Sequence, residues 1–373
     1  MSPPAVTLAA PQPDEIEVSI FGPGKGEAIA VHLGGGRWMT VDSCVNQRTA
    51  EHPVLEYFKQ IGVNPARQVD LVVGTHAHDD HTGGISQLFE ASEQAFFVTS
   101  AAFTAEEFFH TLAADARIER RMRHAVRKEY REVYRLLGER KGRSKPTPMV
   151  QAIEQRSVYS RASLWDGGPA VEVKSLSPSD TAILRSRNKL AEGLADLDDR
   201  QRLSTGDINE ASVVLWIRIG DLALLLGADQ TTGPGGCGWQ AIDTSHYPDI
   251  KASFFKVPHH GSENAHLDAT WTNLLTDDVI AALAPFRHGS TNLPKASDVA
   301  RILSRAKEGY STARPGKLQL SPESKKTAQL LPSFATNVRE IDGVPGHVQA
   351  RRTYGADGWI VGLASPAHQL SVT

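Results

Sequence analysis

The sequence contains few cysteines, no long apolar run and little net charge, and each of these absences removes a class of protein. Cys44 and Cys237 are its only cysteines, too few for a disulfide framework or a thiolate zinc site. No apolar run approaches the length of a membrane-spanning helix, and the start lacks the basic-then-apolar pattern of a signal peptide. The formal charge of −3 argues against attraction of the whole molecule to nucleic acid. We therefore expect a cytoplasmic protein without a membrane partner.

The length and composition describe a globular protein with a large core. Of its 373 residues, 40% are hydrophobic and 22% are charged. One large domain with an insertion and two smaller domains both fit this length. We predict the first: a disordered leader over residues 1–14, a domain over residues 15–365 and a tail over residues 366–373.

Side chains that can bind metal are concentrated between residues 76 and 81, where three histidines and two aspartates lie within six positions. The β-branched run before them predicts a strand over residues 69–73, and helical spacing follows Gly83 and Gly84. Imidazole nitrogens and carboxylate oxygens are the donors that zinc, manganese and iron take, and His76 and His78, two apart, can point the same way. A solvated polar turn is the alternative interpretation, but a metal site explains the clustering better.

Two further candidates follow apolar strands in the second half. A hairpin over residues 212–226 ends in Gly-Ala-Asp, which places Asp229 at a strand end. The strand that begins at residue 254 ends in the adjacent pair His259 and His260. A turn aspartate and a core histidine are the ordinary explanations of such residues taken one at a time. Together with residues 76–81 they indicate distant partners of one site.

A basic segment interrupts the regular pattern of strands and helices. Residues 117–145 contain twelve lysines and arginines against four glutamates, and apolar residues at helical spacing run through them. We assign this helix to an insertion over about residues 101–205. A solvated helix face is the first interpretation of its charge; guidance of an anionic substrate such as nucleic acid is the second.

The remaining segments alternate between the two kinds of secondary structure, which predicts an α/β (α+β) fold. Alternating or apolar runs predict further strands at residues 16–21, 28–33, 38–41, 95–98, 170–176, 279–283 and 358–363. Helical spacing predicts helices at residues 53–61, 105–112, 183–197 and 296–306.

The stretch His-x-His-x-Asp-His at residues 76–81, in its strand-loop-helix context, resembles the hallmark of the metallo-β-lactamase-fold hydrolases. The resemblance implies a four-layer αβ/βα sandwich with a one- or two-metal site along the edge between its two sheets. It implies the following roles: His76 and His78 hold the first ion, Asp80, His81 and His260 hold the second, Asp229 bridges them, and Asp42 supports the ligands.

The sequence departs from the family pattern at the third motif, where many members carry another histidine. The strand there ends in Ser177-Pro178-Ser179-Asp180. Either Asp180 replaces the histidine as an oxygen ligand, or water completes a weaker first site. More oxygen donors shift the preference toward manganese, although zinc remains compatible.

The motif Pro-His-His-Gly-Ser at residues 258–262 and the missing histidine resemble the branch that includes the nuclease domain of competence-type DNA-uptake proteins. This resemblance covers about residues 15–100 and 210–305. It does not extend to the membrane channel of those proteins or to the basic insertion.

Hydrolysis by metal-activated water is the chemistry that such a site favours, with two divalent ions, zinc or manganese, as the expected cofactors. The leading hypothesis is a phosphodiesterase or nuclease acting on nucleic acid or nucleotides, with Asp80 and either His259 or His288 in catalytic roles. The alternatives are a hydrolase of a lactone, thioester or β-lactam, with the insertion as a lid, and a regulatory module without catalysis. Protein partners are not predicted.

Overall fold

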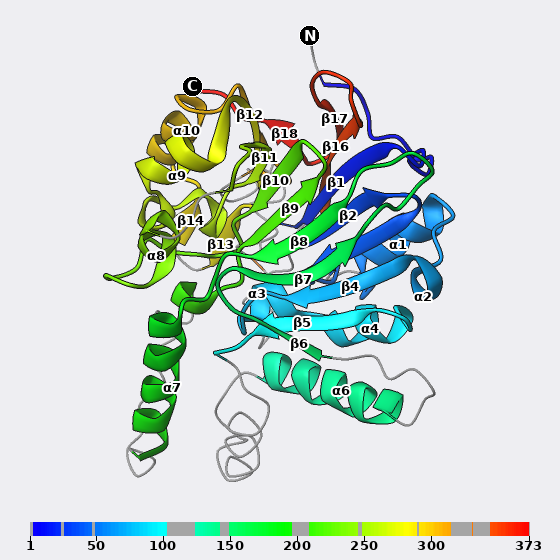
Figure 1. Ribbon diagram of the computed structural model, residues 1–373. Helices are drawn as coiled ribbons and strands as arrows, with labels where there is room; N and C mark the ends of the chain where they lie inside the picture. The colour runs from blue at the N-terminus through cyan, green and yellow to red at the C-terminus, as the bar shows by residue number, and fades with distance from the viewer. Residues whose placement is uncertain are drawn as a thin grey trace.

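The computed structural model describes most of the chain (Figure 1). The described residues are 3–23, 26–46, 49–102, 124–141, 149–195, 209–244, 248–288, 291–314, 330 and 344–372. The helix expected at residues 105–112 lies outside these ranges. Within the described residues, no helix is long and apolar enough to cross a membrane.

Eight strands from the first half of the chain and its C-terminal part form the first sheet. Its strands β3, β4, β5 and β6 run parallel to one another, and the other pairs are antiparallel. Their order is β17 (Ile360–Ala364), β16 (Gly346–Thr353), β1 (Glu15–Gly22), β2 (Ala28–Gly34), β3 (Arg37–Val41), β4 (Val69–Gly74), β5 (Phe96–Ser100) and β6 (Met149–Ala152).

The second sheet also has eight strands and is built mainly from the second half. Strands β10, β11, β12 and β15 are parallel, and antiparallel strands complete both edges. The order is β18 (His368–Gln369), β15 (Glu308–Ser311), β12 (Leu275–Leu283), β11 (Ala252–Lys256), β10 (Leu222–Leu226), β9 (Leu215–Ile219), β8 (Val171–Ser175) and β7 (Arg156–Arg161). Strands β13 (Phe286–His288) and β14 (Thr291–Leu293) form a separate hairpin.

Three apolar layers hold the two sheets and their helices together. Apolar residues of both sheets form one core between the sheets, because alternate side chains of each strand face inward. The outer face of the first sheet packs on α1 (Pro53–Gln60), α4 (Ile85–Ala91) and α6 (His124–Lys141), and the outer face of the second on α8 (Gly238–Thr244), α9 (Asp268–Leu274) and α10 (Ala296–Leu303). The predicted four-layer αβ/βα sandwich is thus confirmed, and Figure 1 shows the two groups of helices on opposite sides.

The ends of the chain differ from the expected leader and tail. Instead of being disordered, residues 3–14 lie along the first sheet: Ala5 pairs with Leu363, and the side chain of Gln349 bonds the backbone of Thr7. The tail is also part of the fold, because β18 extends the second sheet beside β15. Backbone hydrogen bonds to strands of the two sheets hold these segments in place.

The described part of the insertion contains strands as well as helices. Strands β6, β7 and β8 fall within residues 101–205 and belong to the two main sheets. Helix α6 occupies the described part of the basic segment and packs against α4 and α3 (Asp79–Thr82). A second helix, α7 (Asp180–Ala195), extends away from the sheets in Figure 1. The described part of the basic segment, residues 124–141, is thus a helix on the outer layer of the sandwich.

Candidate metal centre

The candidate ligands follow the ends of neighbouring parallel strands in both sheets. In the first sheet, β4 ends at Gly74 and leads into His76, His78 and α3. In the second sheet, β10 ends two residues before Ala228 and β11 ends three residues before His259. Parallel strands place their carboxyl ends at one edge of a sheet, so the two halves bring their loops to a common edge.

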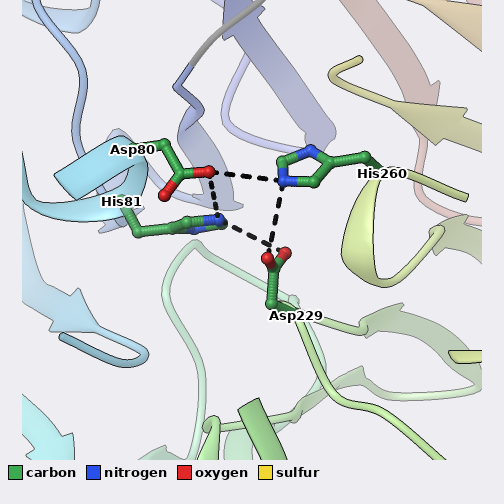
Figure 2. Close-up of side chains that lie close together, drawn as sticks. All are labelled: Asp80, His81, Asp229 and His260. Carbon is green, nitrogen blue, oxygen red and sulfur yellow. Dashed lines mark ion pairs between the residues drawn. The ribbon is translucent and has the colours of Figure 1, made fainter. Parts of the chain in front are cut away.

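Four side chains converge at this edge in the first group of donors (Figure 2). Asp80 and His81 come from α3, whereas Asp229 and His260 come from loops of the second half. His260 Nε2 lies 3.4 Å from Asp80 Oδ2 and 3.4 Å from Asp229 Oδ2. His81 Nε2 lies 3.3 Å from Asp229 Oδ1 and 3.8 Å from Asp80 Oδ2. All four donor atoms are close enough to share one ion.

A second group of donors shares Asp229 with the first. His76 Nε2 lies 3.1 Å from His78 Nδ1 and 3.9 Å from Asp229 Oδ2. These three residues again place their donor atoms within reach of one ion. The structure therefore brings these expected ligands into two adjoining groups that share Asp229. A third set of donors, Asp42, His76 and His81, overlaps both groups.

Hydrogen bonds behind the donors fix the orientation of the imidazole rings. His81 Nδ1 donates to Asp42 Oδ2 over 2.7 Å, which directs Nε2 into the first group. His260 Nδ1 donates to the carbonyl of Ala284 over 2.9 Å, with the same result. Thr75 Oγ1 donates to Asp42 and lies 2.9 Å from His76 Nδ1. Such partners set the tautomer of ligating histidines, which is the supporting role expected of Asp42.

The electrostatic field of the cluster favours a positive charge at its centre. Burial acts to lower the pKa of His260, but Asp229 and Asp80 raise it to about 10. The pKa of His81 is likewise raised well above its ordinary value, because Asp229, Asp42 and Asp80 outweigh burial. Burial and the neighbouring imidazoles lower the pKa of His76, which keeps this ring neutral. A divalent cation satisfies the same field.

The donors also fit a metal because two of them make no hydrogen bond of good geometry. His81 Nε2 and Asp229 Oδ1 are fully buried and lie 3.3 Å apart, but neither is hydrogen-bonded among the described residues. A buried polar atom without a partner is costly, and a shared cation removes that cost for both atoms. Mixed nitrogen and oxygen donors suit zinc and manganese alike.

Backbone strain is concentrated at the same place. Within the described ranges, six non-glycine residues have a positive φ, and four belong to the cluster or stand next to it. They are Asp42, Ala228, His259 and His260, with φ between 46° and 56°. Strained backbone of this kind persists where the surrounding structure holds functional side chains in place.

The structure separates Asp180 from the other expected ligands. Its exposed side chain stands at the first turn of α7, and it belongs to neither group of donors. Just before it, Ser177 is buried and donates to the carbonyl of Ser212 over 2.6 Å. The expectation that Asp180 replaces the third-motif histidine is therefore not supported, because the helix begins at this residue and leaves its carboxylate at the surface.

The two candidate catalytic histidines differ in what the structure describes. His259 is not a member of either group, which agrees with the choice of His260 as the ligand. Its Nδ1 lies 3.0 Å from Asn264 Oδ1, and its Nε2 lies 3.4 Å from Asn209 Nδ2. His288 is paired with Thr291 in the β13–β14 hairpin, but its side chain lies outside the described part of the structure.

Glu27 and Lys256 are two buried residues beside the cluster that the sequence interpretation did not single out. Lys256 Nζ lies 2.6 Å from Glu27 Oε1 and 3.9 Å from Asp229 Oδ1. Burial raises the pKa of Glu27, and the charge of Lys256 acts against that increase. A lysine inside the apolar strand that precedes His259 was the available signal, since an isolated charge seldom lies in a buried strand.

Comparisons with known proteins find solved structures that resemble this one. No family model and no curated protein matches the sequence. The metallo-beta-lactamase fold protein YhfI from Bacillus subtilis is 12% identical over 72% of this chain and 85% of that one, with a TM-score of 0.33. A mutant of CmlA beta-hydroxylase is 14% identical over 73% of this chain and 46% of its own, with a TM-score of 0.35. This chain thus spans less than half the length of the second protein.

The site and its scaffold together define a class of protein. The sandwich brings two groups of His and Asp donors, suited to metal ions, to the edge between its two sheets. Such an arrangement indicates a metal-dependent hydrolase.

Proposed function

We propose that this protein is a hydrolase that uses two divalent ions, zinc or manganese, to cleave phosphodiester bonds in nucleic acid or nucleotides. The observation that carries the proposal is the convergence of two donor groups on the shared carboxylate of Asp229. When bound, such ions supply Lewis acidity and a water whose pKa lies near roughly 7. His76 and His78 hold one ion, and Asp80, His81 and His260 hold the other.

We propose that His259 contacts the substrate. Burial lowers its pKa, so the ring is neutral near pH 7. With Nδ1–H donated to Asn264, the atom that remains to accept a proton or contact a phosphate is Nε2, near Asn209. Asp80 keeps its carboxylate ionised, because the charges of His81 and His260 outweigh burial and lower its pKa. It is therefore available as a metal ligand and as a hydrogen-bond acceptor that orients a water molecule.

Support for phosphodiesters as the substrate comes from the motif at residues 258–262, which resembles the competence-type nuclease branch. The position that carries a third-motif histidine in many family members has no imidazole here, so the two donor groups draw on four histidines and two aspartates. Mixed nitrogen and oxygen donors of this kind suit divalent ions that activate water and stabilise charge on a phosphate.

A small-molecule hydrolase is the second candidate, and the described part of α6 favours it. Arg140 is buried and donates to the carbonyls of Phe89 and Ser92. Arg135 forms ion pairs with Glu132 and Glu139. These two arginines are therefore occupied within the helical layer, which leaves less of the segment's positive charge to gather a polyanion.

One screen separates the two candidates. Purified protein, loaded with Zn²⁺ or Mn²⁺, is assayed on single- and double-stranded DNA, RNA, cyclic nucleotides and bis(p-nitrophenyl) phosphate, and in parallel on a lactone, a thioester and a β-lactam. We expect cleavage of phosphodiesters that disappears in Asp229→Asn. Turnover of the lactone, thioester or β-lactam alone would replace the phosphodiester proposal with the second candidate. Metal-free wild-type protein without turnover of any substrate would favour the regulatory module.

A further inference from the structure

A buried ion pair joins the two sheets behind the candidate metal centre. The 2.6 Å contact between Lys256 Nζ and Glu27 Oε1 links two side chains that are both fully buried. Glu27 directly precedes β2 of the first sheet, and Lys256 is the last residue of β11 in the second. The pair therefore spans the edge at which the ligands of the two halves meet.

Each member of the pair also holds a loop that carries ligands. The backbone N–H of Glu27 donates to the carbonyl of Asp80 over 2.9 Å. Lys256 Nζ donates to the carbonyl of Ala228 over 2.8 Å, directly before Asp229. Gly26 shows how closely the loops approach: a Cβ there would lie 3.3 Å from the Asp80 carbonyl, and its φ of +101° suits glycine. The backbone of Glu27 and the side chain of Lys256 thus connect the segments of Asp80 and Asp229 to the two residues of one ion pair.

Stability alone is a poor explanation for this pair. Taking both charges out of water costs about as much as their attraction returns, and an apolar pair of similar size often serves a core equally well. A charged pair instead contributes geometry. The distance between its ammonium and carboxylate groups is closely defined, and the remaining N–H groups of the lysine can donate to neighbouring carbonyls.

We propose that the Glu27–Lys256 pair is a positioning element that sets the separation of the Asp80 and Asp229 loops. It thereby shapes the donor group of Asp80, His81, Asp229 and His260. This inference rests on the proposed metal-dependent function. Neither side chain is itself assigned as a ligand.

The test replaces both charges together, because removal of one alone leaves the other buried without a partner. The double variant Glu27→Gln/Lys256→Met keeps similar side-chain volumes. The matched control is Glu17→Gln/Arg351→Met, which removes an equally short 2.6 Å pair between a fully buried glutamate and an arginine. That pair joins β1 to β16 within one sheet. Its other partners are Ser19, Tyr57, Gln349 and the backbone of Ala9, away from the donor groups.

Zinc stoichiometry and affinity are measured by titration of metal-free protein, together with the visible spectrum of the Co²⁺-loaded forms. We expect the double variant to fold, to bind its second zinc ion at least about tenfold more weakly, as outer partners of metal ligands typically do, and to show an altered Co²⁺ spectrum. The control should keep wild-type affinity and spectrum.

Wild-type zinc affinity and an unchanged Co²⁺ spectrum in a folded double variant would overturn the inference, as would an equal loss in the control. If the double variant does not fold, Glu27→Asp gives the same comparison, because it keeps both charges and shortens one side chain. Weaker zinc binding in Glu27→Asp supports the positioning role, and unchanged binding refutes it. A wild-type protein that binds no metal would instead refute the proposed function, which separates the two failures.

Discussion

At the scale of single residues, the shared carboxylate of Asp229 distinguishes this site from an ordinary cluster of polar residues. Asp229 is buried, lies within 3.4 Å of both His81 and His260, and also faces His76. Replacement of one oxygen by an amide in Asp229→Asn keeps the shape but removes the charge that both donor groups use. We expect loss of metal from both groups and a fall in turnover of more than about 100-fold, beyond the roughly 10- to 100-fold typical of outer partners.

Metal content by elemental analysis and turnover of bis(p-nitrophenyl) phosphate measure this effect. Asp180→Asn is the matched control, because Asp180 is exposed on α7 and outside both donor groups. It should keep wild-type metal content. Loss of metal in Asp180→Asn would restore Asp180 as a ligand and contradict the arrangement described above.

The adjacent histidines 259 and 260 are predicted to separate metal binding from turnover. His260 is buried among the carboxylates, whereas His259 contacts two asparagines. His260→Ala should therefore lose bound metal and activity together. His259→Ala should keep its metal and lose turnover by roughly 100-fold, the usual size of a proton-transfer contribution. Elemental analysis beside initial rates gives the result, and the opposite pattern would assign His259 as the ligand.

At the scale of secondary-structure elements, the strands and loops around the metal motif were predictable because the signal is local. An apolar run, a break and then His-x-His-x-Asp-His fixes both the strand β4 and its functional end. Strand β16 was missed because its pattern is polar. Its residues Gln349 and Arg351 are paired with Glu17 and Tyr57 in a buried polar network, so burial does not require apolar side chains there.

Long-range pairing explains the other differences at this scale. The hairpin before Asp229 was predictable from its local sequence pattern. The Glu27–Lys256 pair was not, because it joins segments from different halves of the chain. The position of Asp180 depends on where α7 begins, and helix ends are the least certain feature of a sequence pattern. The donors that are near in sequence were therefore predictable, whereas their buried neighbours from distant segments were not.

Helix α6 is attached to the sandwich by an arginine, which gives a prediction at the element scale. The Arg140 guanidinium is buried, lies 4.0 Å above the ring of Phe89 and donates to carbonyls at the end of α4. Arg140→Met should lower the free energy of unfolding by about 3 kcal/mol, since hydrogen bonds from a charged group are lost and carbonyls stay buried.

Urea unfolding followed by circular dichroism measures this change. Arg135→Met is the control on the same helix, because the Arg135 side chain is exposed and its ion pairs are at the surface. The control should change stability little. If both variants unfolded alike, the attachment of α6 through Arg140 would be wrong.

At the scale of the whole molecule, the two sheets and their shared edge can function only while the sandwich stays folded, and buried histidines limit its stability in acid. His32 is fully buried in β2, where its Nδ1 donates to the Glu15 carbonyl and its Nε2 accepts from the Gly36 N–H. The contact with Gly36 requires the neutral ring, because a protonated Nε2 cannot accept a hydrogen bond. Burial accordingly lowers the pKa of His32 to about 4.

This shift predicts a loss of stability as the pH falls. In the unfolded chain His32 has an ordinary pKa near 6.5. In the folded protein it stays unprotonated until the pH falls to about 4. Between these values His32 alone removes about 1.4 kcal/mol per pH unit, or about 2 kcal/mol by pH 5. Above pH 6.5 the effect vanishes. In His32→Gln, which cannot take up that proton, the unfolding free energy should be lower at pH 7.5 but fall less steeply toward pH 5. Urea unfolding at several pH values compares the two slopes, and parallel slopes would show that His32 does not titrate on unfolding.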